Sequence, residues 1–266
     1  GIVPAQQVLT HEAYLPQILG HHLKGGIYSQ ISGMDIIRDR EGEFYVLEDN
    51  LRTPSGVSYM LESRKISQKL MPDLCQSNHV LAIEQYPQLL KQILAESAYV
   101  DNPFIVVLTP GRFNSAYYEH SFLAREMDVP LVSARDLFVE NDKVYVRTLR
   151  GRQQVDVIYR RVDDAFLDPL CFKADSTLGV AGLMSAYLAH NVVISNAPGT
   201  GVADDKSIYP YVDKMIEYYL NEKPMLKNVP TYQCREHNAL EYVLENLEKL
   251  VVKEAQGSGG YGMLIG

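Results

Sequence analysis

The stretch DIIRDREGEFYVLEDNLRTPSG, residues 35–56, organises the interpretation of the rest of the chain. Two apolar runs flank a polar turn that contains glycine, which is the pattern of a β-hairpin. With the turn centred on residues 41–42, Asp35 lies opposite Glu48, and their Cβ atoms are about 5 Å apart. Asn50 follows Glu48 by two positions and projects from the same face. One face of the hairpin is therefore predicted to carry two carboxylates and an amide.

Like charges that face each other across a strand pair are destabilising, so this acidic face needs either a cation or free access to water. Asp35, Glu48 and Asn50 offer hard oxygen donors, and Mg²⁺ prefers one or two carboxylates completed by waters and phosphate oxygens. We interpret the three residues as a magnesium site. The alternative is a solvated hairpin whose acids simply face water. Arg52, which comes directly afterwards, places a cation where a phosphate could rest.

Composition indicates an ordinary globular protein. The chain has 266 residues, 46% hydrophobic and 22% charged, and can bury a full core divided into two or three lobes. The net charge of -8 argues against a nucleic-acid partner, because phosphate binding needs a basic surface. Apolar runs such as residues 104–108 are far shorter than the roughly 20 residues that span a bilayer, and no signal peptide is recognised.

Cysteine usage fits a reducing compartment. Cys75, Cys171 and Cys234 are isolated and odd in number, so they indicate neither a disulfide framework nor a zinc site. We therefore expect a cytoplasmic protein without a membrane partner. The chain begins at Gly1 without a methionine, which leaves a preceding segment open.

The middle of the chain alternates helices with short apolar strands. Apolar periodicity predicts helices over residues 57–71, 87–97 and 179–189, and a helix capped by Asn114 or Ser115 that runs to about Met127. Runs rich in β-branched residues predict strands over residues 104–108, 130–132, 144–148, 155–159 and 192–195. This alternation indicates an α/β fold with a mostly parallel sheet and helices on its faces. Ligands of such sheets bind at the carboxyl ends of the strands.

Two loops at strand ends carry side chains that a substrate could contact. The first loop contains Arg112, Asn114, Ser115, Tyr117 and Glu119, and the second begins with Arg160 and Arg161. Backbone amides at a helix start together with a guanidinium fit an anionic substrate. The alternatives are a capped helix and a surface ion-pair cluster. His120 by itself is expected to be a helix-packing residue.

The last third of the chain carries a second signal for phosphate binding. Asp204, Asp205 and Lys206 are predicted to open a helix that runs to about Leu220. Residues 230–232 have extended character, and residues 240–250 are predicted to form another helix. A strand over residues 250–253 then ends at Lys253 and leads into the glycine-rich segment Gly257, Ser258, Gly259, Gly260, Tyr261 and Gly262.

The glycine-rich segment matches the pattern GxGxxG, but a dinucleotide-binding motif needs a helix directly after the glycines. Residues 263–265 predict a returning strand instead. A Walker loop is excluded as well, because Lys and Ser/Thr do not follow the last glycine. We interpret the segment as a hairpin whose backbone amides fold over phosphates while Lys253 supplies a positive charge. The alternative is a flexible turn without a ligand.

Taken together, these pieces resemble the nucleotide site of the ATP-grasp superfamily in a permuted order. In that superfamily an Asp-Lys pair and a Val-Val-Lys strand hold the ATP phosphates, a Gly/Ser-rich loop covers them, and an Asp with a Glu-x-Asn set holds magnesium. The matching pieces here are Asp205-Lys206, Val252-Lys253, residues 257–262, Asp35 and Glu48-Asp49-Asn50. The metal strands come first and the lysines last, as in circularly permuted ATP-grasp proteins.

Three runs make the resemblance specific to the type 2 branch, often named glutathionylspermidine synthase-like: LEDNLRTPSG (residues 47–56), TPGRFNSAYYEH (109–120) and NAPGTGVADDK (196–206). The resemblance implies a metal-binding part of the ATP-grasp lobe over residues 1–65. It implies a Rossmann-like pre-ATP-grasp substrate domain over residues 66–200. The lysine and glycine part of the lobe follows over residues 201–266, and the segment that clasps the adenine is expected outside this sequence.

The activity implied by the resemblance is an ATP-dependent carboxylate-amine ligase that uses ATP and Mg²⁺ and proceeds through an acyl phosphate. Lys206 and Lys253 would neutralise the phosphates, and Arg52 would stabilise charge on the transferred group, which makes Arg52 and Lys253 the candidate catalytic residues. A kinase that uses the same site and a non-catalytic nucleotide-binding protein are the alternatives. All three require the acidic hairpin and the closing glycine-lysine segment to meet in space.

Overall fold

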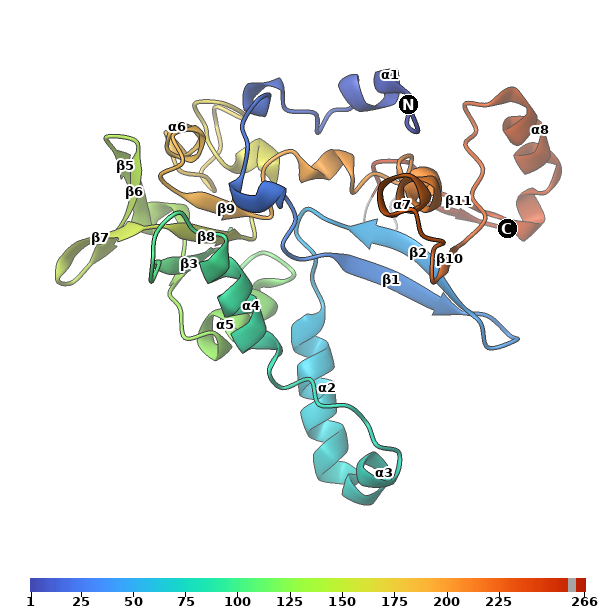
Figure 1. The fold of residues 1–266 in the computed structure, drawn as a ribbon, viewed down its shortest axis with the longest axis horizontal. Helices are drawn as coiled ribbons and strands as arrows, with labels where there is room; N and C mark the ends of the chain where they lie inside the picture. The colour runs from blue at the N-terminus through green and yellow to red at the C-terminus, as the bar shows by residue number, and fades with distance from the viewer. Residues whose placement is uncertain (258–261) are drawn as a thin grey trace. The chain divides into compact units, whose positions relative to one another are not determined.

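A computed structural model describes residues 1–257 and 262–266 of the chain. The chain divides into two compact units (Figure 1). Unit 1 consists of Gly1–Tyr14, Ser32–Leu51 and Thr200–Gly266, and unit 2 consists of Leu15–Ile31 and Arg52–Gly199. Each unit is described separately. Within the described residues, no helix combines the length and the apolar character that crossing a membrane requires.

Unit 2 is built on a four-stranded sheet in which every pairing is parallel, as the alternation of strands and helices predicts. The strands lie in the order β4 (Leu131–Val132), β3 (Ile105–Leu108), β8 (Val157–Arg160) and β9 (Val193–Ser195). All four residues of β3 are buried, because helices cover both faces of a parallel sheet.

The helices of unit 2 are α2 (Val57–Leu70), α3 (Pro72–Ser77), α4 (Tyr86–Glu96), α5 (Tyr117–Glu126) and α6 (Leu183–Leu188). Successive residues of a strand point to opposite faces, and β3 accordingly divides its side chains between two cores. Ile105 and Val107 pack with apolar residues of α2, α4 and α5. Val106 and Leu108 pack in the other core, to which α6 contributes. One face of the sheet thus packs against α2, α4 and α5, and the other packs against α6 together with apolar residues such as Leu137, Val144 and Val155.

A separate antiparallel sheet in unit 2 corrects part of the prediction. It contains β5 (Leu137–Glu140), β6 (Lys143–Thr148) and β7 (Gly151–Val155). The predicted strand over residues 155–159 is in fact divided between β7 and β8 at Asp156. The Asp156 carboxylate accepts a hydrogen bond from the Phe104 backbone N–H (2.8 Å), and the Asp156 N–H donates to the Phe104 carbonyl (3.0 Å). These bonds tie the chain to the start of β3.

Two helices of unit 2 begin later than predicted. The first, α5, begins at Tyr117, and neither Asn114 nor Ser115 caps it with a side chain. Asn114 instead accepts a hydrogen bond from the Ala116 N–H (2.9 Å) in a local turn. The second, α6, begins only after Gly182, whose φ of 83° is left-handed. Side chains that bond to nearby backbone compete with helix formation and delay the first turn.

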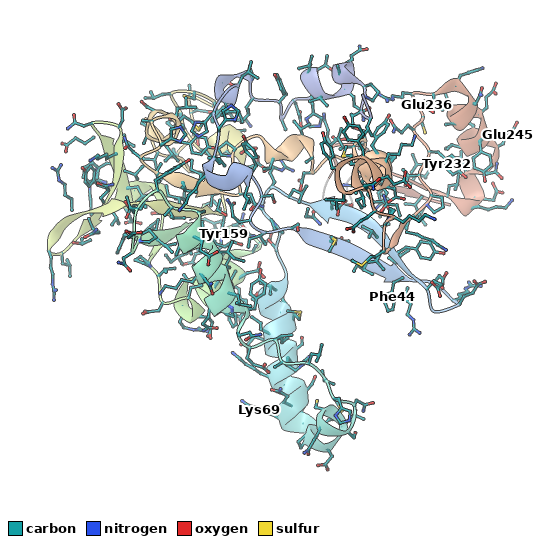
Figure 2. All side chains as sticks on the ribbon, in the orientation of Figure 1. Phe44, Lys69, Tyr159, Tyr232, Glu236 and Glu245 are labelled. Atoms are coloured by element: carbon teal, nitrogen blue, oxygen red, sulfur yellow. The ribbon has the colours of Figure 1, made fainter. Side chains whose placement is uncertain are left out.

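Unit 1 contains a three-stranded sheet in the order β1 (Gly33–Arg38), β2 (Phe44–Asn50) and β10 (Lys227–Asn228). Strands β1 and β2 form the predicted antiparallel hairpin, and Asp35 lies opposite Glu48 as predicted. A bulge between Asp35 and Ile36 shifts the register. Phe44 lies at the turn end of the hairpin, 52% exposed (Figure 2).

The other α-helices and strands in the described part of unit 1 are α1 (Ala5–Leu9), α7 (Val212–Leu220), α8 (His237–Glu245), β11 (Val251–Val252) and β12 (Leu264–Ile265). Strands β11 and β12 pair antiparallel, which confirms the returning strand after the glycines. The prediction that a helix begins at Asp204 is wrong. Short 3₁₀ turns precede α7, which begins at Val212.

Two more boundaries in unit 1 differ from the prediction. The sequence predicts extended backbone over residues 230–232, but the strand found there, β10, covers residues 227–228. Helix α8 lies earlier than residues 240–250 and is followed by a 3₁₀ turn at Leu247–Lys249. Glu236 and Glu245 mark the two ends of α8 in Figure 2. Pairing with the hairpin explains the first difference, because Lys227 lies beside Tyr45 of β2.

Candidate functional site

The acidic face of the hairpin in unit 1 has the composition that the sequence predicts. Asp35 and Glu48 are directly opposed across β1 and β2. The Asn50 side-chain N–H₂ donates to the Asp35 carboxylate (3.3 Å) and to the Gly33 carbonyl (3.2 Å). The amide is therefore fixed beside Asp35.

Two lysines from distant parts of the sequence contact the carboxylate of Glu48. The Lys206 Nζ lies 3.2 Å from Glu48 Oε1, and the Lys253 Nζ lies 3.9 Å from Glu48 Oε2. All three side chains are partly exposed. The opening hairpin and the closing lysine segment thus meet in unit 1, as the sequence analysis requires. The Glu48 carboxylate therefore lies between two ammonium groups in a partly exposed cluster.

Lys206 also forms hydrogen bonds with the segment that leads into the glycine-rich stretch. Its backbone N–H donates to the Ala255 carbonyl (3.1 Å), and its Nζ donates to the Gly257 carbonyl (2.8 Å). Gly262 adopts a φ of 64° on the returning side, where a Cβ would overlap the Glu254 side chain. Ser258, Gly259 and Gly260, predicted to bind phosphate, lie outside the described residues.

Asp49 lies between the two metal-site candidates on β2 and, by strand alternation, faces the opposite side of the hairpin. Burial, followed by the negative charge of Glu48, raises the pKa of the Asp49 carboxyl above its ordinary value. The pair Asp35 and Glu48 therefore shares its face with Asn50 and not with a third carboxylate. In the described part of the chain, no group of three or more His, Cys, Asp or Glu residues is arranged to hold a metal.

The second predicted loop of unit 2 begins at the carboxyl end of β8 and is buried. Arg160 is fully buried and lies 2.7 Å from the Asp164 carboxylate. It also donates hydrogen bonds to the carbonyls of Asn196 (2.7 Å), Val162 (3.1 Å) and Ala197 (3.2 Å). A guanidinium with this many protein partners holds together the ends of β8 and β9.

Glu119 and Arg161 hold the loop that leads into α2. The Glu119 Oε2 accepts from the backbone N–H groups of Gly56 (2.8 Å) and Ser58 (3.0 Å), so its negative charge caps the N-terminus of α2. Arg161 donates to the Ser55 hydroxyl (2.6 Å) and the Thr53 carbonyl (3.2 Å). Each side chain is only 1% exposed. The structure therefore brings these two predicted residues together as a buried pair.

The pairing of Glu119 and Arg161 is incomplete. The Glu119 Oε1 lies 3.9 Å from Arg161 Nη2, beyond hydrogen-bond distance. Among the described residues, neither this oxygen nor the Arg161 Nε has a hydrogen-bond partner. Since both charges are buried, hydrogen bonds to neighbouring groups compensate them: Glu119 accepts from Gly56 and Ser58, and Arg161 donates to Thr53, Ser55 and Tyr159.

The other predicted residues of unit 2 lie nearer the surface. Arg112, Asn114 and Ser115 are exposed after the end of β3, and Tyr117 at the start of α5 is partly buried. Arg52 forms a partly exposed ion pair with Asp163 at 3.0 Å. Arg112, Asn114, Ser115 and Tyr117 thus follow the carboxyl end of the parallel strand β3.

His120 gives unit 2 a pH-dependent stability. Its Nδ1 lies 2.9 Å from the Thr109 hydroxyl, and burial, followed by the charge of Arg161, lowers the pKa of His120 to about 4. The folded state thus favours neutral His120, and this contribution is complete above the unfolded value of about 6.5 and is lost as pH falls toward 4. We expect the free energy of unfolding to fall by about 2 to 3 kcal/mol from this group between about pH 7 and about pH 4.5.

Urea unfolding across this pH range, compared with His120→Gln, measures that contribution, because the variant keeps every other titrating group. The variant is expected to show a shallower decline than the parent. Parallel declines for the two proteins would contradict the assignment.

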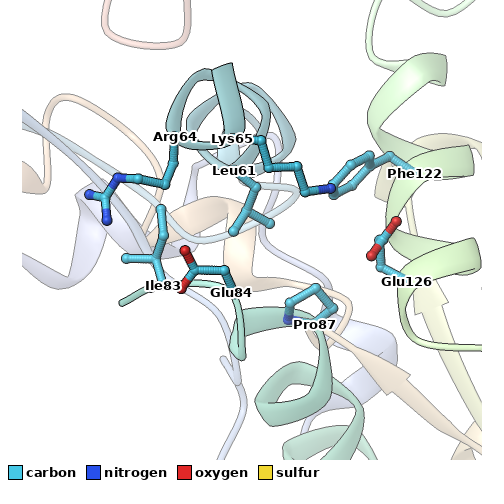
Figure 3. Close-up of a pocket in the computed structure, with 8 residues that line it drawn as sticks. All are labelled: Leu61, Arg64, Lys65, Ile83, Glu84, Pro87, Phe122 and Glu126. Atoms are coloured by element: carbon cyan, nitrogen blue, oxygen red, sulfur yellow. Dashed lines mark hydrogen bonds between the residues drawn. The ribbon is translucent and has the colours of Figure 1, made fainter. Parts of the chain in front are cut away.

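A shallow pocket in unit 2 lies apart from every predicted site residue. It has a volume of about 110 Å³ and is lined by Leu61, Arg64, Lys65, Ile83, Glu84, Pro87, Phe122 and Glu126. Figure 3 shows Arg64 and Lys65 of α2 across from Glu84 and Glu126. Internal contacts already engage these charges, since Lys65 pairs with Glu62 and Glu84 accepts from Gln68.

One residue that the sequence did not single out belongs beside the lysine cluster. His11 contacts the Asp205 carboxylate at 2.7 Å, next to Lys206. The two residues are 194 positions apart. No local motif marks His11, and only the fold brings it to this place.

A family model described as a circularly permuted ATPgrasp matches residues 1–266. An uncharacterized protein of Mycobacterium tuberculosis is 51% identical over 268 residues, covering 100% of this chain and 49% of that protein. An uncharacterized protein of Synechocystis is 50% identical, covering 100% of this chain and 56% of that protein.

A protein of Frankia casuarinae named "Putative glutamate--cysteine ligase 2-2" is 43% identical over 240 residues, covering 89% of this chain and 28% of that protein. The chain thus spans about half the length of the first two relatives, and a smaller part of the third.

Proposed function

Because the chain belongs to the circularly permuted ATP-grasp family, we propose that it carries the phosphate-binding and metal-binding part of an ATP-dependent carboxylate-amine ligase. The activity of the whole protein is part of this proposal, since the chain spans about half of its relatives. Within the family, the three long runs favour the type 2, glutathionylspermidine synthase-like branch. The ligase name of the Frankia relative is consistent with amide formation.

The observation that carries the proposal is the position of Lys206 and Lys253 on either oxygen of Glu48. Two ammonium groups in one exposed cluster fit the charge of a triphosphate, and a carboxylate among them fits a cation that accompanies it. Lys206 and Lys253 would contact phosphate oxygens. The backbone amides of residues 257–262 would close over the same phosphates.

The donor set suits magnesium. Asp35 and Glu48 face each other across the hairpin and Asn50 lies beside Asp35, which gives the one or two carboxylates and the further oxygen donor that Mg²⁺ accepts. Bound there, Mg²⁺ would supply charge neutralisation for the phosphates. The lysines would act on the remaining phosphate charge, and closure of the glycine segment would exclude water from the acyl phosphate.

The proposed reaction has two steps. An oxygen of the substrate carboxylate attacks the γ-phosphorus of ATP, the bond from that phosphorus to the bridging oxygen of ADP breaks, and an acyl phosphate forms. An amine then attacks the acyl carbon, phosphate leaves with its oxygen, and the amine loses a proton to give the amide. Arg52 and Lys253 are our candidates for stabilising charge on the transferred phosphoryl group.

We assign substrate binding to unit 2, which we interpret as the Rossmann-like pre-ATP-grasp domain, with Arg112, Asn114, Ser115 and Tyr117 as substrate contacts. Glu119, Arg160 and Arg161 were candidates as well. Their burial and protein partners favour a supporting role, in which they hold the loops that carry the contacting residues. The metal and phosphate functions belong to unit 1.

The proposal is tested by incubating the protein with ATP, Mg²⁺ and pools of amino acids, small peptides and polyamines. We expect ADP release that depends on a carboxylate and an amine together, with a new amide detected by mass spectrometry. The same incubation with Lys206→Met serves as the control for the site. A phosphorylated product without an amide would identify a kinase, and tight ATP binding without ADP release would identify a non-catalytic protein.

A further inference from the structure

The N-terminal segment of unit 1 contacts the residues on either side of Lys206. Helix α1 is short and is followed by His11, whose side chain is only 7% exposed. The His11 Nε2 lies 2.7 Å from the Asp205 Oδ2, and the Asp205 side chain is 2% exposed. Asp205 directly precedes Lys206, so this buried contact is one residue away from a proposed phosphate ligand.

The surroundings of His11 define its tautomer. The Ala13 backbone N–H donates to the His11 Nδ1 at 3.0 Å, so this nitrogen acts as an acceptor and carries no proton. The proton of the neutral ring is then on Nε2, where it is donated to Asp205. Because a backbone amide always donates, the direction of the bond to Asp205 is fixed by the protein.

Asp205 is held on both oxygens. While Oδ2 accepts from His11, Oδ1 accepts from the Ser207 backbone N–H at 2.6 Å. Burial acts to raise the pKa of Asp205, but the hydrogen bonds from Ser207 and His11 outweigh it and hold this pKa below its ordinary value. Both oxygens of the Asp205 carboxylate therefore accept a hydrogen bond from the protein.

The residues on either side of Lys206 are fixed by the same segment. Gln7 of α1 donates from Nε2 to the Ser207 carbonyl (2.5 Å), while the Lys206 N–H itself donates to the Ala255 carbonyl (3.1 Å). The lysine backbone is thus held at its own amide and at both neighbours. Ordering a lysine side chain costs up to about 2 kcal/mol of rotamer entropy. A fixed Lys206 backbone restricts the positions that its Nζ can reach, and this favours binding at one place.

From these contacts we propose that His11 is a positioning residue, which acts through Asp205 to fix Lys206 for its contact with the phosphates of ATP. The inference deepens the proposed function and rests on it for the identity of the ligand. Among the described residues, no hydrogen bond or ion pair joins His11 to Glu48 or Lys253. Its role is to orient the segment from which the lysine extends.

The test uses two substitutions that separate shape from hydrogen bonding. His11→Phe keeps a ring in the buried place but removes the donor, whereas His11→Gln keeps an N–H near the position of Nε2. We expect His11→Phe to weaken the Kd for Mg²⁺-ATP by at least about tenfold, in the range found when residues that orient a ligand are lost. We expect His11→Gln to stay within about threefold of the parent, because it retains a donor.

A second readout follows Lys206 without nucleotide. Amide hydrogen exchange measured by mass spectrometry is expected to accelerate by at least about tenfold in the peptide that covers residues 204–208 of His11→Phe. The rest of unit 1 and the unfolding midpoint are expected to change little. Thr10→Ala is the matched control, because Thr10 is an exposed neighbour whose hydroxyl donates to the Gln6 carbonyl of α1.

The outcomes separate the two proposals. Unchanged exchange at residues 204–208 in His11→Phe would overturn the positioning role, and so would faster exchange spread evenly over unit 1, which would indicate general destabilisation. Equal ATP affinity of the phenylalanine and glutamine variants would also overturn it. If the parent protein does not bind Mg²⁺-ATP, the proposed function fails, while the exchange experiment still decides whether His11 fixes the Lys206 segment.

Discussion

Replacing Glu48 by glutamine is expected to lower ATP turnover by at least about a hundredfold, because it removes the charge that Lys206 and Lys253 share. The substitution keeps the shape and most of the hydrogen-bonding capacity of the side chain. It takes away the negative charge at a proposed magnesium ligand and leaves two ammonium groups facing a neutral amide. ADP release measured with saturating ATP and Mg²⁺ gives the result directly.

Glu43→Gln is the matched control for Glu48→Gln. Glu43 lies at the exposed turn of the same hairpin, where its N–H is bonded to the Asp39 carboxylate and its side chain is outside the lysine cluster. We expect turnover by Glu43→Gln to match the parent, with both variants showing the far-ultraviolet circular dichroism of the parent. If Glu48→Gln turned over ATP at the parental rate, Glu48 would have no part in metal binding.

Replacing Arg160 by methionine is expected to lower the free energy of unfolding by about 3 to 5 kcal/mol, the usual cost of removing one member of a buried ion pair. Methionine roughly fills the space but leaves the Asp164 carboxylate buried without its cation. It also removes the hydrogen bonds donated to three carbonyl groups at the ends of β8 and β9. Urea-induced unfolding at neutral pH measures the loss.

A second variant makes this expectation specific. In Arg160→Met combined with Asp164→Asn the uncompensated charge is gone, so part of the lost stability is expected to return. Arg150→Met, at an exposed position, controls for the loss of a surface arginine and is expected to change the unfolding free energy by less than about 0.5 kcal/mol. If Arg160→Met kept parental stability and lost activity, Arg160 would be a substrate ligand and not a support.

Much of the fold follows from local patterns. The continuous apolar run that became β3 is buried on both faces, as β-branched residues between turn signals predict. The returning strand after Gly262 was predictable because apolar residues, and not a helical period, follow the glycines. Patterns of this kind depend on neighbours in sequence, and the same neighbours determine backbone conformation.

Element boundaries were less predictable where side chains bond to backbone. The apolar run around Asp156 looks continuous, yet the Asp156 carboxylate binds the Phe104 N–H and the chain changes sheets there. Asp205 accepts from the Ser207 N–H, and the helix predicted from this region begins only at Val212. These bonds compete with regular structure, and their partners are invisible in the local pattern.

The register of the hairpin was predictable from the sequence only in part. Asp35 faces Glu48 as predicted, but beyond a bulge the pairing shifts, so that Ile36 lies opposite Val46. If the pairing had shifted by one residue at Asp35 and Glu48 instead, the two acids would have pointed to opposite faces of the hairpin. The bulge keeps Asp35 opposite Glu48 although the pairing nearer the turn is shifted by one residue. The turn residues alone do not predict this bulge.

By itself the sequence determined the alternating elements, the acidic hairpin and the motifs that place this chain with the permuted ATP-grasp proteins, because each depends on residues within a few positions of one another. The tertiary structure alone decided that Arg160, Arg161 and Glu119 are buried among protein partners and that His11 reaches Asp205. Burial and pairing across long sequence separations depend on how complete elements pack, and the cost of an unpaired buried charge selects which side chains meet there.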